Sequence, residues 1–505
     1  MRSEFVQQVV ACARQLAGRE PGQPTPPPDL GPGARWYPRS WRRVAGTDCF
    51  AARDGASWFL ALAGNGTAWE QFAGEVVAPG SRPVKLVPQA AAGAGLRALF
   101  PETAPRPLPA DSPSFGCGDR LGLATPGHLR ALAGYQVAPV LAQQSIRELT
   151  LTGRTYGEVV DAATWSVFQE GWRDGFGADG DHLKTAAEVR DLLAAGATFI
   201  TLDLSLCLGR TEQCPPMPAA LRDDAGRCWG GADTTLTIET ADIERFWQVY
   251  GPAFPFIEEA HRLCEAARGA GGFDLEISVD ETPETTRPVD HLLLARELQR
   301  RGIGVTSVAP RFPGEFQKGI DYIGDLETLA EAVAQHAAIA REFGHKLGIH
   351  SGSDKFAAFP LLGEAAGDRL HVKTAGTSWL EAVRVVAATD PPLFRAIWAA
   401  AAAGFPRARQ YYHIRTHLAE VAEAAAIPDA ELPALLDQDA PRQFLHITYG
   451  EILRAPAAAG GTLGDRLREN LAAHEERYAA GLEAHFRRHL ESLGLPARCQ
   501  VIGDR

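Results

Sequence analysis

The stretch that decides the fold is Phe273-Asp-Leu-Glu-Ile-Ser-Val-Asp280, because apolar and polar residues alternate along it. An alternation of this kind is typical of a β-strand whose two faces meet different surroundings. The apolar set is expected to face helices, and the polar set is expected to face the axis of a barrel. The two sets are Leu275, Ile277 and Val279 against Glu276, Ser278 and Asp280. Polar groups in a barrel interior are costly unless they are paired, bound to metal or solvated.

Outward from this strand, short apolar segments alternate with segments of helical periodicity between residues 115 and 400. The strand candidates are 120–125, 137–142, 178–184, 198–203, 273–280, 303–309, 346–350 and 370–374. Helices are expected between most of them, for example over 186–195, 290–301, 325–343 and 377–402. Eight such units predict an α/β protein with a (β/α)8 TIM-like barrel.

The two ends of the chain differ from this central part. Residues 1–114 contain short apolar runs and two proline-rich linkers, which indicates a small β-rich or mixed N-terminal region. Residues 401–505 are mainly helical in pattern and are expected to form a C-terminal extension. An insertion at 204–235, after the fourth strand, lacks clear periodicity and is expected to cover the barrel mouth.

Composition limits the class of protein. The chain has 505 residues, of which 45% are hydrophobic and 22% charged, which is typical of a soluble globular protein. The formal net charge of −12 argues against nucleic acid as a partner, because phosphate contacts need clustered cations. No apolar run reaches the roughly 18 residues that a membrane span needs, and the N-terminus lacks the pattern of a secretory signal. We therefore expect no membrane contact and a cytoplasmic location.

Several residues at strand ends predict a metal site. His182, Glu276 and His350 come from three different strands of the predicted barrel, and together they suit a divalent metal. Asp203, Asp280 or Glu281 is expected to complete the site or to act as a catalytic base. The alternative for each histidine is a hydrogen-bonded core residue without a ligand.

A second set of residues predicts a small anionic substrate. Cations lie at or just after the strand ends, namely Lys184, Arg311, Lys318, Lys355 and Lys373. Arg311 suits a carboxylate through two parallel hydrogen bonds, and Gln143 is placed to bind a sugar hydroxyl. A solvated surface lysine is the alternative for Lys318. The usual glycine-rich phosphate loops are not found in the sequence, so the pattern leaves a carboxylate or a phosphate open.

Seven motifs resemble the tagaturonate epimerase family. They are FGCGDRLGLATPGH (115–128), APVLAQQSIRELT (138–150), FQEGWRDGFGADGDHLKT (168–185), EISVDET (276–282), APRFPGEFQKGIDYIGDLE (309–327), IHSGSDKF (349–356) and HVKTAGTSWLEAVRV (371–385). The resemblance is strong over roughly 115–390 and weak at the ends. It implies an isomerase of hexuronate breakdown that interconverts D-tagaturonate and D-fructuronate with a divalent metal, for which zinc, manganese and nickel are the candidates.

The implied reaction suggests a mechanism and leaves alternatives. Inversion at a hydroxyl-bearing carbon β to a ketone suits retro-aldol cleavage and re-addition, with Asp280 or Asp203 as the base. Another metal-dependent ketose epimerase or an aldolase, acting on neutral or phosphorylated sugars, would use similar residues. A non-catalytic sugar-acid binding protein is a third reading. The sequence does not indicate the oligomeric state.

Overall fold

A closed barrel of parallel strands is the centre of the computed structural model, which describes residues 3–21, 33–231, 234–421, 423–458 and 460–498. Within these ranges its eight strands are β6 (Ser114–Gly118), β7 (Ala138–Ser145), β8 (Gly177–Leu183), β9 (Phe199–Asp203), β12 (Asp274–Ser278), β13 (Ser307–Ala309), β14 (Lys346–Ile349) and β15 (Leu370–Thr374). The last strand pairs with the first, so the sheet has no free edge. The predicted (β/α)8 fold is confirmed.

Helices surround the barrel, and their boundaries follow from local sequence. They are α3 (Thr125–Leu132), α4 (Ile146–Thr152), α5 (Tyr156–Glu170), α6 (Ala186–Ala194), α9 (Phe254–Arg268), α10 (Pro288–Arg300), α11 (Leu326–Phe343), α12 (Phe359–Ala366) and α13 (Thr377–Thr389). In α11, for example, Asp325 accepts the amide hydrogen of Thr328 at the N-terminus, and Gly344 ends the helix in a left-handed conformation. Its buried residues Leu329 and Val333 face the barrel at helical spacing.

Two predicted elements differ from the structure. The first strand is Ser114–Gly118 and not 120–125, so that prediction was wrong. Asp119 is the reason: its buried carboxylate accepts backbone hydrogen bonds from Leu121 through Thr125, which turns the chain into α3. The predicted helix 377–402 is two helices, because Asp390 and Pro391 end α13 and start α14 (Pro391–Ala408).

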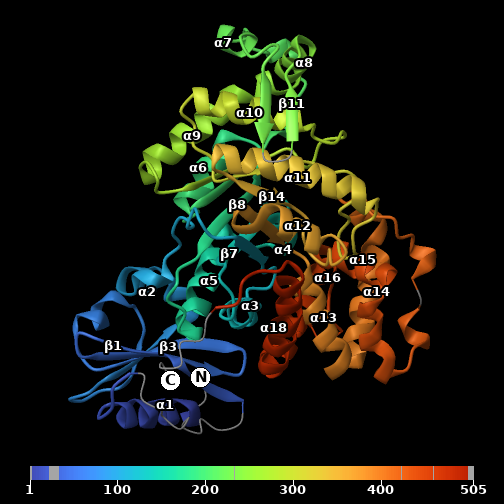
Figure 1. Cartoon of the computed structure of the whole chain (residues 1–505). Helices are drawn as coiled ribbons and strands as arrows, with labels where there is room; N and C mark the ends of the chain where they lie inside the picture. The colour runs from blue at the N-terminus through green and yellow to red at the C-terminus, as the bar shows by residue number, and fades with distance from the viewer. Residues whose placement is uncertain (1–2, 22–32, 232–233, 422, 459, 499–505) are drawn as a thin grey trace.

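The N-terminal region is a small α/β layer beside the barrel (Figure 1). Over residues 34–88, strands β1 (Ala34–Val44), β2 (Thr47–Asp54), β3 (Ser57–Ala63), β5 (Val84–Pro88) and β4 (Glu75–Ala78) form an antiparallel sheet in that order. Helix α1 (Ser3–Leu16) lies across one face and buries Phe5 against Phe59. The other face packs on α2 (Gly93–Leu99) and on α5 of the barrel, through Leu96, Trp165 and Phe168. The predicted β-rich or mixed character is confirmed.

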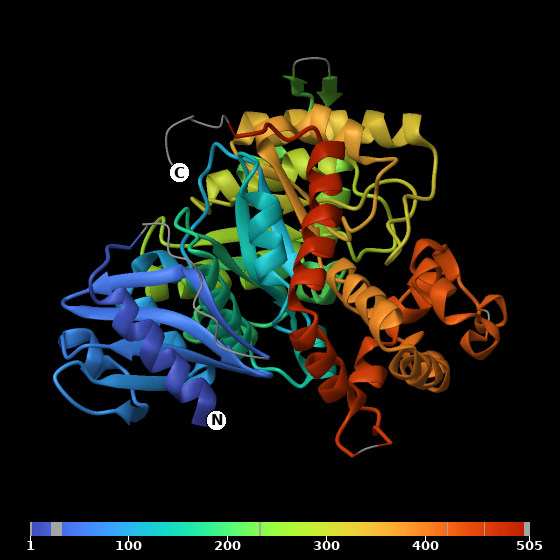
Figure 2. The ribbon, with the colours of Figure 1, turned by 90° about the horizontal axis from the view of Figure 1, so that it is seen from below.

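The C-terminal part is helical, as predicted. It contains α14, α15 (Asp439–Ile447), α16 (Tyr449–Arg454), α17 (Leu463–Ala473) and α18 (Glu475–Ser492). Helix α18 runs along the barrel beside α3 (Figure 2), and Phe486 lies 5.9 Å from Phe115 of the first strand, measured between ring centroids. No helix among the described residues has the length and hydropathy of a membrane span. The division of the chain at residues 114 and 400 stays a prediction.

The insertion after β9 does not cover the barrel mouth in its described residues. It contains α7 (Ala219–Arg222) and most of the hairpin formed by β10 (Cys228–Gly231) and β11 (Thr234–Thr237). It is followed by α8 (Thr240–Tyr250) and lies against α10 and α11 at the edge of the molecule (Figure 1). Asp224 fixes it there through Arg296, 2.6 Å away, and through Arg300. The expected cover was wrong, because these ion pairs direct the insertion to the helical layer.

Candidate active site at the carboxyl end of the barrel

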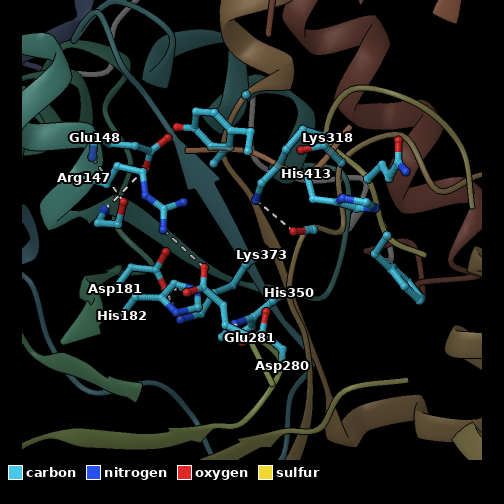
Figure 3. A pocket seen from close by; sticks show the side chains of 18 of the residues that line it. Arg147, Glu148, Asp181, His182, Asp280, Glu281, Lys318, His350, Lys373 and His413 are labelled. Atoms are coloured by element: carbon cyan, nitrogen blue, oxygen red, sulfur yellow. Dashed lines mark hydrogen bonds and ion pairs between the residues drawn. The ribbon is translucent and has the colours of Figure 1, made fainter. Parts of the chain in front are cut away.

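A cavity of about 700 Å³ opens at the carboxyl end of the strands (Figure 3). In a barrel of this kind that end is where loops from all strands meet, so it is the expected position of an active site. The predicted site residues that line it are Gln143, His182, Lys184, Asp280, Arg311, Lys318, His350 and Lys373. The predicted residues Asp203, Glu276 and Lys355 are close by but are not part of the lining.

Lys373 of β15 forms the floor of the cavity. Its Nζ lies 2.6 Å from Oε2 of Glu276, 2.7 Å from Oδ2 of Asp179 and 2.9 Å from Oδ1 of Asp181. Burial opposes the charge of the ammonium, but the three carboxylates outweigh burial and raise the pKa of Lys373 well above its ordinary value. Its charge is therefore already neutralised by the protein, which favours a role in holding carboxylates over the predicted contact with substrate.

The end of β8 departs from regular alternation. Asp179 and Asp181 face the axis, and His182 then adopts a left-handed φ of 55°, which shifts the register with β9. As a result His182 also faces the cavity, and Leu183 packs into the core. Such a backbone conformation costs energy for a residue other than glycine and is found preferentially at functional sites. Sequence alternation predicted the inward His182 but not the two aspartates.

His350 follows β14 and lies between two carboxylates. Its Nε2 is 2.9 Å from Oε2 of Glu276, and its Nδ1 is 3.2 Å from Oδ1 of Asp280. Burial disfavours the charged imidazolium, but Asp280 and Glu276 outweigh burial and raise the pKa of His350 to about 10. The ring centroid of His182 lies 5.0 Å from that of His350, so both imidazoles face the same space.

Three of these residues can hold a metal. One ligand atom each from Asp181, His182 and His350 lies within 4.8 Å of the others, and nitrogen and oxygen donors of this kind suit zinc and related divalent ions. The predicted set shares the two histidines, but Asp181 stands where Glu276 was expected. Carboxylates outnumber the cationic side chains here, which fits a dication. The carboxylates are Asp179, Asp181, Asp203, Glu276, Asp280 and Glu281, and the lysine and arginine cations are Lys184, Lys373 and Arg147.

Glu276 lies beneath this group and orients it. Its carboxylate is fully buried and accepts hydrogen bonds from Thr201 Oγ1 at 3.0 Å and from His350 Nε2. A methyl group in place of the hydrogen of Gly348 would lie 2.7 Å from its Oε1, so this glycine leaves space for the carboxylate. Glu276 is thus placed to fix the ring of His350, as residues behind metal ligands commonly do.

The two candidate bases differ in access. Asp203 ends β9, and its Oδ2 is 3.3 Å from Nδ1 of His182 and 3.1 Å from Nζ of Lys184. Asp280 lines the cavity and also accepts a hydrogen bond from the hydroxyl of Ser278. Burial acts to raise the pKa of each carboxyl, but nearby histidines and hydrogen bonds outweigh it. Both pKa values therefore lie below the ordinary value. Of the two, only Asp280 has the position to touch a substrate directly.

Three further predicted substrate-binding residues line the cavity and differ in their hydrogen-bond partners. Arg311 lines the cavity and donates from Nη1 to the carbonyl oxygen of Thr282. Lys318 lines it from the 310–319 loop, and its Nζ donates to Oγ of Ser351 at 2.8 Å. Gln143 donates to the carbonyl oxygen of Thr374 at 3.1 Å, which leaves its Oε1 without a partner among the described residues.

Lys355 lies outside the cavity. Its ammonium donates to the carbonyl oxygens of Gln317, Ile320 and Ser353 at 2.6 to 2.9 Å. Burial lowers its pKa to about 7 in spite of the adjacent carboxylate of Asp354. Three carbonyl partners satisfy the three ammonium hydrogens, so the structure gives Lys355 a role in holding the loop and does not bring it to the substrate space.

A second cluster of metal-type side chains lies on the outside of the 350–356 loop. Asp354 has Oδ1 2.9 Å from Nε2 of His485 and Oδ2 2.7 Å from Arg442. His489 accepts the backbone N–H of Asp354 through Nε2 at 3.0 Å, so that nitrogen is already occupied. The atoms of Asp354, His485 and His489 lie close enough for a metal. Their existing partners instead attach the loop to α15 and α18.

The cavity wall also contains residues that strand-end reasoning missed. Arg147 and Glu148 follow β7, and Tyr412 and His446 come from the C-terminal part. Arg120 joins them: its Nε lies 2.9 Å from Oε1 of Glu148, and its guanidinium stacks on Tyr449 at 3.7 Å from the ring centroid. Arg147 and Glu148 could have been found from the motif at 138–150, whereas nothing local in the sequence distinguishes Tyr412 or His446.

Comparisons with known proteins agree with this geometry. The family model described as tagaturonate epimerase matches residues 37–214 and 222–493. A tagaturonate/fructuronate epimerase of Thermotoga maritima is 38% identical over 412 residues, which are 79% of this chain and 84% of the relative. The native structure of the fructuronate-tagaturonate epimerase of Cohnella laeviribosi is 38% identical, with a TM-score of 0.87 over 97% of this chain and 99% of that chain. A glycerol complex of the Cohnella enzyme is 39% identical, with a TM-score of 0.86 over 92% and 97% of the two chains.

Proposed function

Because the chain belongs to the tagaturonate epimerase family, we propose that it is an epimerase that interconverts D-tagaturonate and D-fructuronate in the cavity at the barrel mouth. The observation that carries the proposal is the convergence of Asp181, His182 and His350 with Asp280 in one cavity. These four residues come from three strand ends within the region that the family model matches. Their donor atoms suit a metal-assisted reaction of a polyhydroxy ketone.

The chemistry of the substrates favours cleavage of a carbon–carbon bond. The two keto-acids differ at a carbon whose hydroxyl is β to the ketone, and the hydrogen on that carbon is not acidified by the carbonyl. Loss of the hydroxyl proton to a base lets the bond to the neighbouring carbon break. The bonding electrons then form an enediolate, and the other fragment becomes an aldehyde. Rotation of the aldehyde, re-addition of the enediolate to its opposite face and return of the proton give the inverted product.

Asp280 is the base in this proposal. It lines the cavity, whereas Asp203 holds His182 and Lys184 from behind. Charged His350 and His182 are among the causes of the low pKa of Asp280. A ligand imidazole is neutral, so in the metal-loaded enzyme the positive charge near Asp280 would be that of the ion, and the carboxylate would stay ionised and able to accept a proton. Ser278 keeps the carboxylate in position through its hydroxyl.

Asp181, His182 and His350 would hold the divalent ion. When bound there, the ion supplies Lewis acidity that stabilises negative charge on substrate oxygens. Glu276 would orient His350, and Asp203 would orient His182. Lys373 keeps Asp181 ionised and directed toward the site through the 2.9 Å contact between their charged atoms.

Metal analysis of the purified protein, with activity on tagaturonate before and after chelation, tests the proposal. We expect about one divalent ion per chain and loss of turnover on its removal. A matched pair of variants identifies the ligands, because Asp181→Asn should lose most of the metal and Glu276→Gln should keep more of it. A fully active protein that contains no metal would refute the metal site.

The retro-aldol route has its own test. Trapping of an aldehyde or enediolate fragment during turnover would support it. Solvent deuterium at the inverted carbon of the product would instead indicate direct proton exchange and contradict it. Parallel assays with tagaturonate, fructose and ketose phosphates separate this function from that of another ketose epimerase or an aldolase. A cytoplasmic location stays a prediction.

A further inference from the structure

The labelled charged residues of the cavity form two groups in Figure 3: Asp181, Asp280 and Glu281 lie with the histidines and Lys373, and Arg147 and Lys318 lie above them, with Glu148 beside Arg147. The acidic end contains Asp181, Asp280 and Glu281 beside the two histidines. Arg120, Arg147 and Lys318 line another part of the cavity; Arg120 and Lys318 come from the loops after β6 and β13, and Arg147 comes from the first turn of α4. A ligand with a negative charge at one end only would therefore enter the cavity in a single orientation.

Most cations of the cavity already have a carboxylate partner. Lys373 and Lys184 contact aspartates in the barrel, and Arg120 binds Glu148. Arg147 lies 3.6 Å from Glu281, with both side chains more than a third exposed, so this pair is weak. Lys318 and Arg311 differ from all of these, because among the described residues no ion pair joins either to a carboxylate. Arg311 donates to a backbone carbonyl oxygen, whereas the ammonium of Lys318 has a hydroxyl as its hydrogen-bond partner.

Lys318 is held in place by the loop around it. Gln317 accepts hydrogen bonds from the backbone of Arg415 and from Gln443, each at 2.8 Å, and the carbonyl oxygen of Gly319 accepts one from Arg442 at 2.7 Å. These contacts join the loop to the C-terminal part on both sides of the lysine. The ammonium is therefore presented to the cavity from a fixed backbone, with Ser351 as its hydrogen-bond partner.

His446 supplies a second unmatched polar group beside Lys318. It lines the cavity, it is 1% exposed, and its Nδ1 has no hydrogen-bond partner among the described residues. Burial and the nearby cations Arg120 and Lys318 lower the pKa of His446 well below its ordinary value, which keeps the ring neutral. An ammonium without a counterion gains from a ligand with oxygen atoms, and the neutral ring of His446 adds no competing charge beside it.

Lysine is also rare in this chain, which has six lysines against 44 arginines. Lys184, Lys318, Lys355 and Lys373 all lie in the barrel mouth or directly beneath it. The exposed cations are therefore arginines almost throughout. The ammonium of Lys318 is a compact point charge that lines the cavity, which distinguishes it from the exposed arginines.

We propose that Lys318 binds the carboxylate of the sugar acid and so determines the preference of the enzyme for uronates over neutral ketoses. The substrate then lies with its carboxylate at the cationic end and its ketone at the acidic end, near Asp181, His182 and His350. This inference rests on the proposed function of the same cavity. It adds the substrate orientation and the residue that determines specificity.

The test compares two substrates that differ in the charged group. We would measure kcat/KM for D-tagaturonate and for the neutral ketose D-tagatose in the wild type, Lys318→Met and Lys318→Arg. Lys318→Met should lower kcat/KM for tagaturonate about 10- to 100-fold, the size of a lost charge-assisted hydrogen bond, and should leave the value for tagatose nearly unchanged. Lys318→Arg retains the charge and should keep most of the preference. Arg190→Gln, which removes one exposed cation on α6, is the control and should change neither value.

The outcomes separate the two proposals. A wild type without turnover of tagaturonate would overturn the proposed function itself. A wild type that turns over tagaturonate, with an unchanged preference in Lys318→Met, would overturn the role of Lys318. Calorimetric binding of D-galactonate, a sugar acid without the ketone, gives a second measurement when turnover is low. Binding should weaken by a similar factor in Lys318→Met and not in Arg190→Gln, and equal binding in all three proteins would contradict the inference.

Discussion

Two groups of histidines, one at the barrel mouth and one in the helical layer, have opposite electrostatic surroundings in this protein. His182 and His350 at the barrel mouth lie among carboxylates, which raise the pKa of His182 to about 9 and that of His350 to about 10 although burial acts in the other direction. In the helical layer, His291, His336 and His345 contact one another and no carboxylate among the described residues. Burial lowers the pKa of His336 to about 4 and that of His345 to about 3.

The second group forms a hydrogen-bonded chain whose tautomers follow from its geometry. Nε2 of His336 faces the carbonyl oxygen of Thr286 at 3.2 Å, so it carries the hydrogen, and Nδ1 of His336 is an acceptor. His291 therefore donates from Nδ1 to His336 at 3.0 Å and accepts at Nε2 from His345 at 2.9 Å. Burial of a histidine therefore does not indicate a functional site by itself; the neighbouring carboxylates distinguish the two groups.

The largest effect is expected from a change at the mouth. His350→Ala removes one of the three proposed metal ligands and the partner of both Glu276 and Asp280. We expect kcat/KM for tagaturonate to fall at least about 1000-fold, together with loss of bound metal, because the remaining residues cannot stabilise the developing charge. Steady-state kinetics and metal analysis measure both. A variant with normal metal content and activity would show that the two groups do not differ in function.

A matched change in the helical layer should affect stability alone. His291→Leu leaves Nδ1 of His336 and the Nε2 hydrogen of His345 without partners in a buried place. Two unpaired polar groups should lower the free energy of unfolding by about 2 to 5 kcal/mol, measured by urea denaturation. Activity at a temperature where the variant is folded should be close to that of the wild type. A large loss of kcat in a stably folded variant would contradict this assignment.

The hydrogen-bonded histidines of the helical layer should also make the stability of the protein depend on pH. In the unfolded state these side chains take up protons below about pH 6.5, whereas His336 in the folded protein does so only near pH 4. The unfolded state binds more protons between these values, so stability is lost as the pH falls from about 6.5 to 4, by about 3 kcal/mol from His336. Denaturation of wild type and His336→Phe at several pH values measures this contribution as a difference in slope. Parallel pH profiles in the two proteins would exclude it.

The smallest effect on activity is expected from a change at Asp203, which contacts the proposed metal ligand His182. Asp203→Asn keeps the shape of the side chain but removes the charge that faces His182 and Lys184. We expect kcat/KM to fall about tenfold, the lower range for residues that orient a ligand, with Asp280→Asn as the comparison and a much larger loss. A loss in Asp203→Asn as large as in Asp280→Asn would identify Asp203 as the base.

Much of the barrel was predictable because strand and helix periodicity depend on local sequence. Apolar and polar residues alternate over 273–280, and residues 199–203 are mainly apolar. Both segments were predicted as strands, and both are strands in the structure. The first strand was misplaced because 120–125 is as apolar as a strand, while Asp119 captures five consecutive backbone amides there. A side chain that binds the backbone in this way has no periodic pattern.

The candidate site was predictable only in part. His182, His350 and Asp280 were expected because polar residues after parallel strands meet at one end of a barrel. Asp181 was missed because regular alternation cannot place it and His182 on the same side, and the left-handed backbone at His182 does so. His446 comes from the C-terminal part, and a contact so far along the chain leaves no local pattern.

The sequence by itself determined the class of fold, the rim on which the chemistry lies and the family, because these depend on periodicity and on long motifs. Only the tertiary structure decided which charges are already matched. Lys355 and Lys318 look alike as lysines near strand ends. Carbonyl oxygens surround the ammonium of Lys355, whereas that of Lys318 faces the cavity and has no carboxylate oxygen within 4 Å among the described residues. Such a difference depends on distances between residues far apart in sequence, because the energy of a buried charge is determined by its nearest partners.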